Sequence, residues 1–364
     1  MSGHLVGTLP GEERTLGDTI SRLTAGDSLE RDEAREVMLR LMRGEASDAQ
    51  IAALLTALKM RGETAQEIAG FAEGMREAAT VIRPEVSPLL DTCGTGGDGL
   101  ATFNISTAAA FIAAGAGAYV AKHGNRGVSS PCGSADVLEA LGIYIDLEPE
   151  DVRACIEKLG IGFLFAPRFH PAMRHVMRAR RELGIPTAFN LLGPLTNPAG
   201  AEAQVLGVGM RDKAPLIAGA LAQMGVKRAM VVHGEDGMDE LSTTSPSRVW
   251  EIGPHGVESY RLDPEELGMS RAMLRDLAGG DAAENARIIR DEVLAGKRGP
   301  RRDIAVLNAA AALVVAGRAE SLRAGIALAE RSIDHGAARE KLRELVRLSA
   351  AMSAAPGDVR TGGE

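Results

Sequence analysis

Hydrophobic residues recur with a helical period through residues 12–80, and no run of alternating residues suggests a strand there. Ile51, Leu54 and Leu58, for example, share one helical face, and Ser47 stands before them at the spacing of an N-terminal capping box. Thr64 and Glu67 repeat this spacing before the next helical stretch. The segment "RPEVSP", which holds two prolines, then interrupts the pattern. The sequence therefore predicts a helical unit that ends in a linker.

From residue 89 onward, short apolar runs alternate with helical patterns. The strand candidates are "LLDTC", "AYVAK", "IGFLFA", "VLGVGM" and "AMVVHG", and residues 248–262 suggest a hairpin. The expected helices cover 104–116, 134–141, 149–159, 211–224, 281–296 and parts of 303–352. This alternation is typical of an α/β fold, with a mostly parallel sheet flanked by helices and, here, a smaller all-helical domain before it.

An arginine-rich helix over 170–184 and a segment with three prolines over 186–200 interrupt the α/β pattern. If this helix packs on the N-terminal helices, the chain crosses between two domains three times and lines a cleft from both sides. The predicted division is a small helical domain of residues 1–86, joined by 168–196, and a large domain of residues 87–167 and 197–364.

The small domain carries more apolar residues than one face of each helix can hold. Val37, Met38, Leu41 and Met42 follow one another closely. Three or four short helices are not expected to bury all of them, and an exposed apolar patch predicts a dimer in which the patch pairs with its own copy.

Composition narrows the class of protein. Apolar residues make up 45% of the chain, enough for a full core, and a net charge of −8 argues against a general nucleic-acid binder. No apolar run is long enough to span a membrane, and the N-terminus lacks the pattern of a signal peptide. The three cysteines include no CxxC pair, so neither disulfides nor a zinc site is expected. These features predict a cytoplasmic protein.

A glycine-rich loop, "CGTGGDG", joins the first predicted strand to the helix that begins with "NIST". Glycines let backbone N–H groups converge on an anion, and a helix N-terminus favours the same ligand. The spacing matches neither of the common nucleotide-binding loops. The glycines alone fit an ordinary turn equally well. Asp91 and Asp98 flank the glycines. Their position is unusual for a phosphate site, because carboxylates repel a phosphate.

A second candidate anion site follows the next strand. Lys122, His123 and Arg126 are expected to supply positive charge, and nearby serines supply hydroxyl groups. The alternative is a solvated loop with chance basic residues. The anion site is favoured because the two loops end consecutive strands, where α/β sheets bind ligands.

Two adjacent acids, Asp239 and Glu240, follow the last parallel strand, with Glu235 and Asp236 close by. Oxygen ligands of this kind suit Mg²⁺, which proteins commonly hold together with a substrate phosphate. A solvated acidic loop would explain this stretch taken alone. Together with the two phosphate loops, the acids predict a magnesium–diphosphate ligand, which also accounts for an aspartate beside the glycine loop.

The motifs "GTGGD", "NIST", "KHGNRGVSSPCGSADVLEALG", "FNLLGPLTNPA" and "DELS" occur in the order seen in anthranilate phosphoribosyltransferases, and the resemblance extends over residues 12–350. It implies an α/β domain of the nucleoside phosphorylase type, a homodimer joined through the small domains, and Mg²⁺, with two ions expected. The implied reaction moves the phosphoribosyl group of 5-phosphoribosyl diphosphate (PRPP) to anthranilate in tryptophan biosynthesis.

The resemblance also implies roles for individual residues. Lys122, Asp98 and Asn125 are the expected catalytic residues, and Arg180 with Asn125 would contact anthranilate beside Gly94. The metal ligands would be Ser106, Asp239 and Glu240. The residues expected to hold PRPP are Gly94, Gly97, Asp98, Thr102, Asn104, Ile105, Ser106, Thr107, Lys122, His123, Gly124, Asn125, Arg126, Gly127, Val128, Ser129, Ser130 and Ser134.

Two departures from the family pattern lie beside the anthranilate helix. Arg178 stands where the family commonly has proline, and Pro186 replaces a common arginine. Both could shift the pose of anthranilate without touching the PRPP loops.

Two other functions fit parts of the pattern. A pyrimidine nucleoside phosphorylase has the same fold, and a non-catalytic relative could bind nucleic acid in the same cleft. The "KHGN" run followed by "SS" argues against the first, and the acidic charge with an intact "DE" pair argues against the second.

Overall fold

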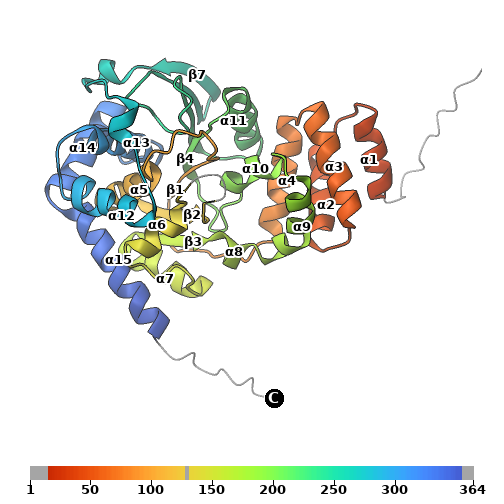
Figure 1. The fold of residues 1–364 in the computed structure, drawn as a ribbon, viewed down its shortest axis with the longest axis horizontal. Coiled ribbons are helices and arrows are strands. Elements are labelled where there is room, and N and C mark those ends of the chain that lie inside the picture. The colour runs from red at the N-terminus through yellow and green to blue at the C-terminus, as the bar shows by residue number, and fades with distance from the viewer. Residues whose placement is uncertain (1–14, 128–130, 355–364) are drawn as a thin grey trace, which may run out of the picture.

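The computed structural model describes residues 15–127 and 131–354. A helical bundle lies on one side of the molecule and an α/β unit on the other (Figure 1). The N-terminal helices of the bundle are α1 (Leu16–Thr24), α2 (Arg31–Met42), α3 (Asp48–Arg61) and α4 (Ala65–Glu77). The predicted capping boxes are present at Ser47 and Thr64, where each hydroxyl accepts from the backbone N–H three residues later.

The residues expected to form an exposed apolar patch on the bundle are buried. Val37, Met38, Leu41 and Met42 are each at most 5% exposed within a single chain. Helix α4 packs closely along α2, and α9 (Arg174–Leu183), from much later in the sequence, adds cover on both α2 and α3. The prediction therefore underestimated how much apolar surface these helices bury against one another.

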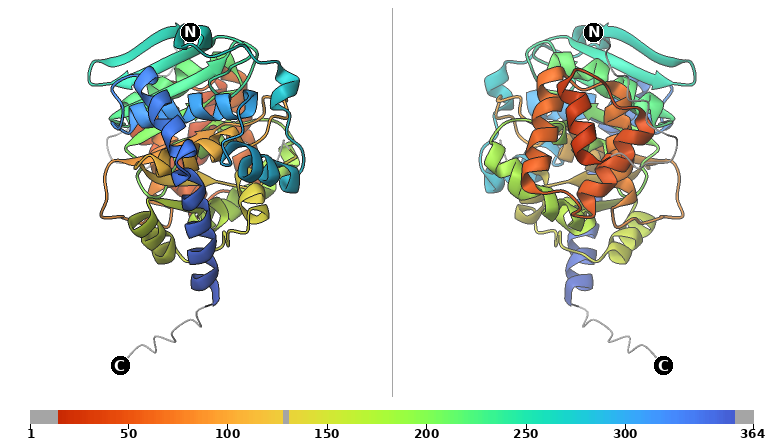
Figure 2. Two further views of the ribbon diagram at one scale, coloured as in Figure 1. Left: turned by 90° about the vertical axis from the view of Figure 1, so that its left-hand side faces the viewer. Right: turned by 90° about the vertical axis from the view of Figure 1, so that its right-hand side faces the viewer.

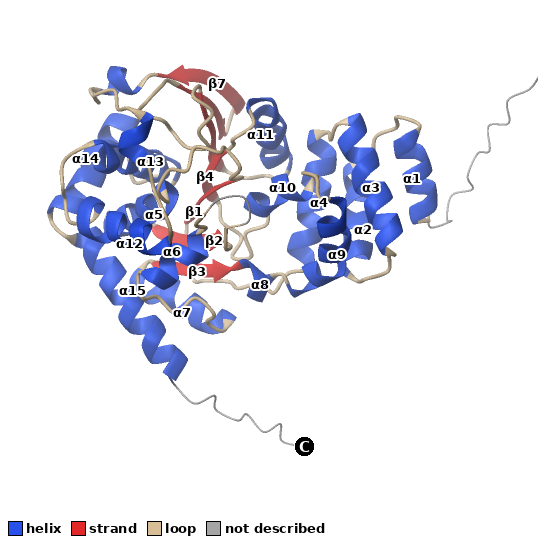
Figure 3. Ribbon diagram, viewed as in Figure 1, coloured by secondary structure: helices blue, strands red, loops and turns tan. Residues whose placement is uncertain are grey.

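Seven strands form one sheet in the order β3-β2-β1-β4-β5-β6-β7 (Figure 3). The first five run parallel, and β6 and β7 form the predicted hairpin at one edge. The strands are β1 (Leu89–Gly94), β2 (Tyr119–Gly124), β3 (Ile161–Phe165), β4 (Ala203–Gly207), β5 (Arg228–Gly234), β6 (Ser247–Gly253) and β7 (Gly256–Leu262). The prediction of a mostly parallel sheet beside a smaller helical unit is confirmed.

Strand β4 begins two residues earlier and ends three residues earlier than predicted. Gly207 is its last residue paired with β1, and the Gly209 N–H turns away to donate to the Thr95 hydroxyl at 3.2 Å. The apolar run therefore continues past the strand into a turn beside the glycine loop.

Helices cover both faces of the sheet. The remaining helices of the chain are α5 (Ile105–Gly115), α6 (Ser134–Ala140), α7 (Pro149–Leu159), α8 (Ala166–Phe169), α10 (Phe189–Leu192), α11 (Ala214–Gln223), α12 (Ala282–Ile288), α13 (Pro300–Val315), α14 (Leu322–Asp334) and α15 (Ala337–Ala354). Short 3₁₀ segments are η1 (Pro171–Met173), η2 (Gly193–Leu195), η3 (Arg211–Lys213), η4 (Pro264–Leu267) and η5 (Leu274–Leu277), and η6 (Ile289–Val293) continues α12 as a π-helix. Among the described residues, no helix has the length and hydrophobicity that crossing a bilayer requires.

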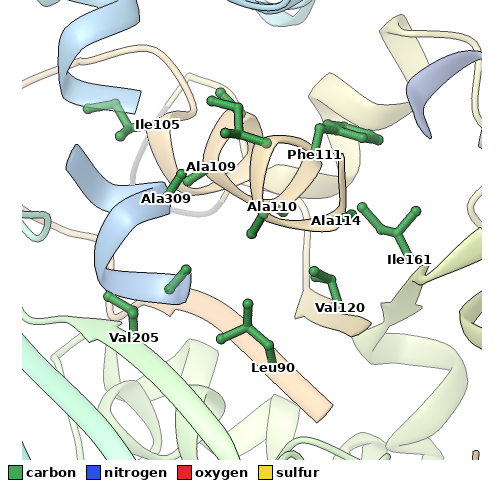
Figure 4. Packing of buried hydrophobic residues seen from close by; sticks show 14 of the residues in the cluster. Leu90, Ile105, Ala109, Ala110, Phe111, Ala114, Val120, Ile161, Val205 and Ala309 are labelled. Atoms are coloured by element: carbon green, nitrogen blue, oxygen red, sulfur yellow. The ribbon is translucent and has the colours of Figure 1, made fainter. Parts of the chain in front are cut away.

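Two hydrophobic clusters flank the sheet. On one face, the alanine-rich helices α5 and α13 lie close to the strands, and Ala109 and Ala110 sit among Leu90, Val120 and Val205 (Figure 4). On the other face, α11 joins the sheet to the bundle through a cluster that continues into α2, α3 and α4. Figure 2 shows the bundle from outside, with the sheet behind it. The proposed division at residues 1–86, 87–167, 168–196 and 197–364 stays a prediction, since this second cluster runs across it.

Candidate active site

The site lies where the strand order changes direction, between β1 and β4. Connections leave these neighbouring strands toward opposite sides, which opens a crevice at their carboxyl ends. A cavity of about 370 Å³ occupies this position. Of the predicted site residues, the following line it: Gly94, Gly97, Asp98, Thr102, Asn104, Ile105, Ser106, Thr107, Lys122, His123, Gly124, Asn125, Arg126, Gly127, Ser134, Asp239 and Glu240.

The acidic loop lies directly on the ends of β1 and β4. Gly94 and Gly207, the last residues of these strands, pair with each other. A Cβ atom on Gly207 would fall 1.5 Å from the Asp239 carbonyl oxygen, and one on Gly94 would fall 2.4 Å from Asp239 Oδ2. Only glycine at both positions allows this approach.

The acids occupy the backbone donors predicted for a phosphate. Asp239 Oδ2 accepts from the Gly96 N–H at 2.8 Å, and Glu240 Oε1 accepts from the Ser106 N–H at 3.0 Å. Ser106 lies in the first turn of α5, where N–H groups are free and the helix dipole favours negative charge. The glycine loop and α5 therefore present anion-binding groups that already hold carboxylates.

Burial and crowding disfavour negative charge on these acids. Burial, followed by the nearby Asp98, raises the pKa of Asp239 to about 7. Burial and Asp239 raise the pKa of Glu240 well above its usual range. Three carboxylates in one cavity repel one another, so the site favours a cation between them.

Lys122 is the buried cation of the site. Its Nζ donates to the Thr92 carbonyl at 2.5 Å and lies 3.4 Å from the Ser106 hydroxyl. Burial lowers the pKa of Lys122, and the negative charges of Asp91 and Glu240 oppose that effect. The ammonium group thus sits between a structural acid and an acid of the cavity.

The two aspartates beside the glycine loop have different environments. Asp91 is fully buried and accepts from the His123 backbone N–H at 3.2 Å and from Asn197 Nδ2 at 2.8 Å. Burial raises the pKa of Asp91 to about 6. Asp98, by contrast, lines the cavity. Only Asp98 is therefore placed to meet a ligand, and Asp91 holds β1, β2 and the Asn197 segment together.

The basic loop carries less free positive charge than predicted. Burial lowers the pKa of His123 to about 3, so this ring is neutral at physiological pH. Arg126 is charged, but its guanidinium pairs with Asp136 and Glu139. The expectation of a cationic His123 is wrong because burial, which the sequence does not display, removes the charge.

Comparison with known proteins assigns the family. The model of the glycosyl transferase family α/β domain matches residues 86–339, and that of the family's helical bundle domain matches residues 17–79. The anthranilate phosphoribosyltransferase of Moorella thermoacetica is 54% identical over 90% of this chain and 96% of its own length. That of Anaeromyxobacter dehalogenans is 56% identical, with 90% and 96% covered. The chain belongs to the anthranilate phosphoribosyltransferase family. The resemblance found in the sequence is thereby confirmed.

Solved structures of the anthranilate phosphoribosyltransferase family share the whole fold. The Thermus thermophilus enzyme superposes with a TM-score of 0.87 at 50% identity, covering 92% of this chain and 99% of its own. The Saccharomyces cerevisiae enzyme, solved in complex with PRPP and Mg, has a TM-score of 0.85 at 30% identity, with 92% and 98% covered.

Arg180, the residue expected to bind anthranilate, does not line the cavity. It lies on α9, and its guanidinium stacks over the Phe189 ring at 4.9 Å from the centroid. Burial lowers the pKa of Arg180, and no carboxylate in the described part of the chain forms an ion pair with it. Its neighbour Arg178 is exposed and pairs with Glu182 and Asp48. The role of Arg180 in this anthranilate phosphoribosyltransferase family member stays a prediction.

Three of the predicted PRPP-binding residues, Val128, Ser129 and Ser130, lie outside the described residues.

Sequence patterns did not identify every residue that lines the cavity. Asn285 closes the wall of the cavity by donating to Asn104 Oδ1 at 3.0 Å and accepting from the Gly280 N–H at 2.8 Å. No sequence signal could reveal this contact, because the two asparagines lie 181 residues apart and only the fold brings them together.

Proposed function

We propose that the protein transfers the phosphoribosyl group of PRPP to the amine of anthranilate, giving N-(5-phosphoribosyl)anthranilate and diphosphate. The observation that carries the proposal is the meeting of two anion-binding loops with Asp239 and Glu240 in one cavity. Membership of the family and the PRPP–Mg complex of the yeast relative support it.

The residues of the cavity fit Mg²⁺ brought in with the diphosphate. Within residues 15–127 and 131–354, no three His, Cys, Asp or Glu side chains form a ready metal cluster. Mg²⁺ is commonly held by one or two carboxylates together with substrate phosphates, and this donor set is of that kind. Asp239, Glu240 and Ser106 would hold the metal, with two ions expected. Bound Mg²⁺ would neutralise charge on the departing diphosphate.

The chain's own residues bind and orient the reactants. Lys122 stabilises negative charge as the bond between the anomeric carbon and diphosphate breaks. Asn125 and Arg180 align the amine of anthranilate for attack on that carbon, and the amine needs no strong base because its lone pair is free. Asp98, which lines the same cavity, would lie next to the bound metal and diphosphate. Closure of the bundle over the α/β unit excludes water, which would otherwise hydrolyse PRPP.

The reaction products test this proposal directly. Protein incubated with PRPP, Mg²⁺ and anthranilate should form a species with the mass of N-(5-phosphoribosyl)anthranilate and an equal amount of diphosphate. Free ribose 5-phosphate with anthranilate left intact would instead indicate a hydrolase and overturn the proposal.

Replacing Arg180 by alanine is expected to raise the KM for anthranilate far more than the KM for PRPP. A charge-assisted hydrogen bond to a carboxylate is worth about 1.5–3 kcal/mol, which corresponds to about a 10- to 150-fold weakening. Arg181→Ala is the matched control, since Arg181 is an exposed arginine of the same helix. A rise in the KM for PRPP alone would move Arg180 to the phosphate site.

We also propose a homodimer and a cytoplasmic location. The apolar residues first taken as the dimer patch are buried within the protomer, so the dimer rests on the family resemblance alone. Light scattering at micromolar concentration should give twice the chain mass, and a monomer would refute the dimer. Cell fractionation should recover the protein with the cytoplasm, and recovery with membranes would refute that location.

A further inference from the structure

The loop between β5 and β6, residues 235–246, carries both Asp239 and Glu240 but contains no helix or strand. Loops of this length are mobile unless other contacts hold them, and a metal site needs ligands in fixed positions. The groups that hold this loop therefore matter for what its acids can bind.

One part of the loop is held by its own side chains. Asp236 accepts from the Met238 N–H at 3.2 Å and from the Ser242 hydroxyl at 2.7 Å, and it also bonds the Thr244 hydroxyl. These contacts close the loop around Asp236, which does not line the cavity. They fix the flanks of the loop and leave the peptide that follows Glu240 to be held from elsewhere.

Asn308, in the middle of α13, holds that peptide. Its Oδ1 accepts from the Leu241 N–H at 2.9 Å, and its Nδ2 donates to the Leu241 carbonyl at 2.9 Å. Nδ2 also donates to the Ile304 carbonyl of its own helix at 3.0 Å, which fixes the side-chain rotamer. Asn308 is 2% exposed, and Leu241 is fully buried.

This pair of bonds copies the pairing between two strands. The donor and the acceptor of one planar amide fix the peptide groups on both sides of Leu241. They therefore also fix the direction in which the side chain of the preceding residue, Glu240, leaves the main chain. An alanine or an aliphatic side chain supplies neither group, and the single, shorter oxygen of a serine cannot occupy both positions at once. Since α13 packs against α5 and the sheet, the amide is anchored to the same core that carries the Ser106 N–H.

We propose that Asn308 is a positioning residue that directs the Glu240 and Asp239 carboxylates toward a divalent cation bound with a diphosphate group. This inference rests on the proposed function, since it takes Mg²⁺ and PRPP as the ligands. It adds a residue on α13, 68 positions after Glu240, that touches neither ligand.

Two measurements test the role of Asn308. Hydrogen exchange by mass spectrometry, on protein without ligands, reports the Leu241 amide. Calorimetry of PRPP binding over a series of Mg²⁺ concentrations reports the ligand site. The variants are Asn308→Ala and the milder Asn308→Ser, which can retain one hydrogen bond. Ser332→Ala is the control, because it removes a buried bond of 2.8 Å to the Ile112 carbonyl away from the cavity.

Asn308→Ala should speed exchange across residues 235–246 and raise the Mg²⁺ concentration for half-maximal PRPP binding by about 10- to 100-fold, the range for groups that orient metal ligands. Asn308→Ser should show a smaller change of the same kind, and it decides the matter if the alanine variant does not fold. Ser332→Ala should change thermal stability only. Unchanged Mg²⁺ dependence in both Asn308 variants would overturn the proposal. Failure of the wild type to consume anthranilate would refute the transferase reaction, while exchange and PRPP binding would still decide the role of Asn308.

Discussion

Asp239→Asn combined with Glu240→Gln should lower turnover at limiting Mg²⁺ by about 100-fold or more while the protein stays folded. The two carboxylates lie on the ends of β1 and β4 and face both anion-binding loops. The asparagine and glutamine that replace them have the same size and still carry a hydrogen-bond acceptor, but they lack the negative charge that attracts a cation. Steady-state rates over a Mg²⁺ series measure the effect.

The same double variant should be more stable than the wild type in the absence of Mg²⁺ and PRPP. Because the pKa of Asp239 is raised to about 7, the folded protein keeps a proton that the unfolded chain releases near pH 4. The contribution of Asp239 to the free energy of unfolding therefore falls as the pH rises from about 4 to about 7, and the amide removes this loss at pH 7 and above. Denaturant unfolding at pH 5 and pH 8 measures the difference. Two results would contradict this account of the acidic pair. One is a turnover of the double variant equal to that of the wild type at limiting Mg²⁺, and the other is a double variant that is less stable than the wild type at pH 8.

Lys122→Met should lower both activity and stability. Loss of one preorganised charge at the leaving group costs about 100- to 1000-fold in turnover. In addition, the buried Thr92 carbonyl loses its donor, which costs about 1–3 kcal/mol, and Asp91 and Glu240 lose the positive charge that opposes the rise of their pKa values. Kinetics and denaturant unfolding measure the two effects separately.

The two variants thus separate the roles of charge in the cavity. Removal of acids should cost function and increase stability, whereas removal of Lys122 should cost both. Turnover of Lys122→Met within tenfold of the wild type would show that Lys122 serves the fold alone.

Local signals in the sequence predicted the elements that depend on neighbouring residues. The capping boxes at Ser47 and Thr64, the hairpin and most of the parallel strands follow from spacing and periodicity. The glycine and acidic loops were also visible, because their residue types are unusual at strand ends. Such features need no knowledge of the rest of the fold.

Features that depend on long-range packing were not predictable. The charge of His123 was misjudged because its burial arises from the fold. The apolar residues of α2 appeared in excess because the close packing of α4 on α2, with further cover from α9, arises only in the folded bundle. Asn285 and Asn308 gave no signal, since an isolated asparagine in a helix has no distinctive pattern and its partner lies far away in the sequence.

Anthranilate fluorescence tests the central claim most directly. With the protein present, we expect the signal to fall over time only when PRPP and Mg²⁺ are both added. It should remain constant when either is omitted, and at limiting Mg²⁺ the double variant Asp239→Asn, Glu240→Gln should show little decrease. Constant fluorescence with all components present, or an equal decrease without PRPP, would contradict the assignment of this cavity to phosphoribosyl transfer.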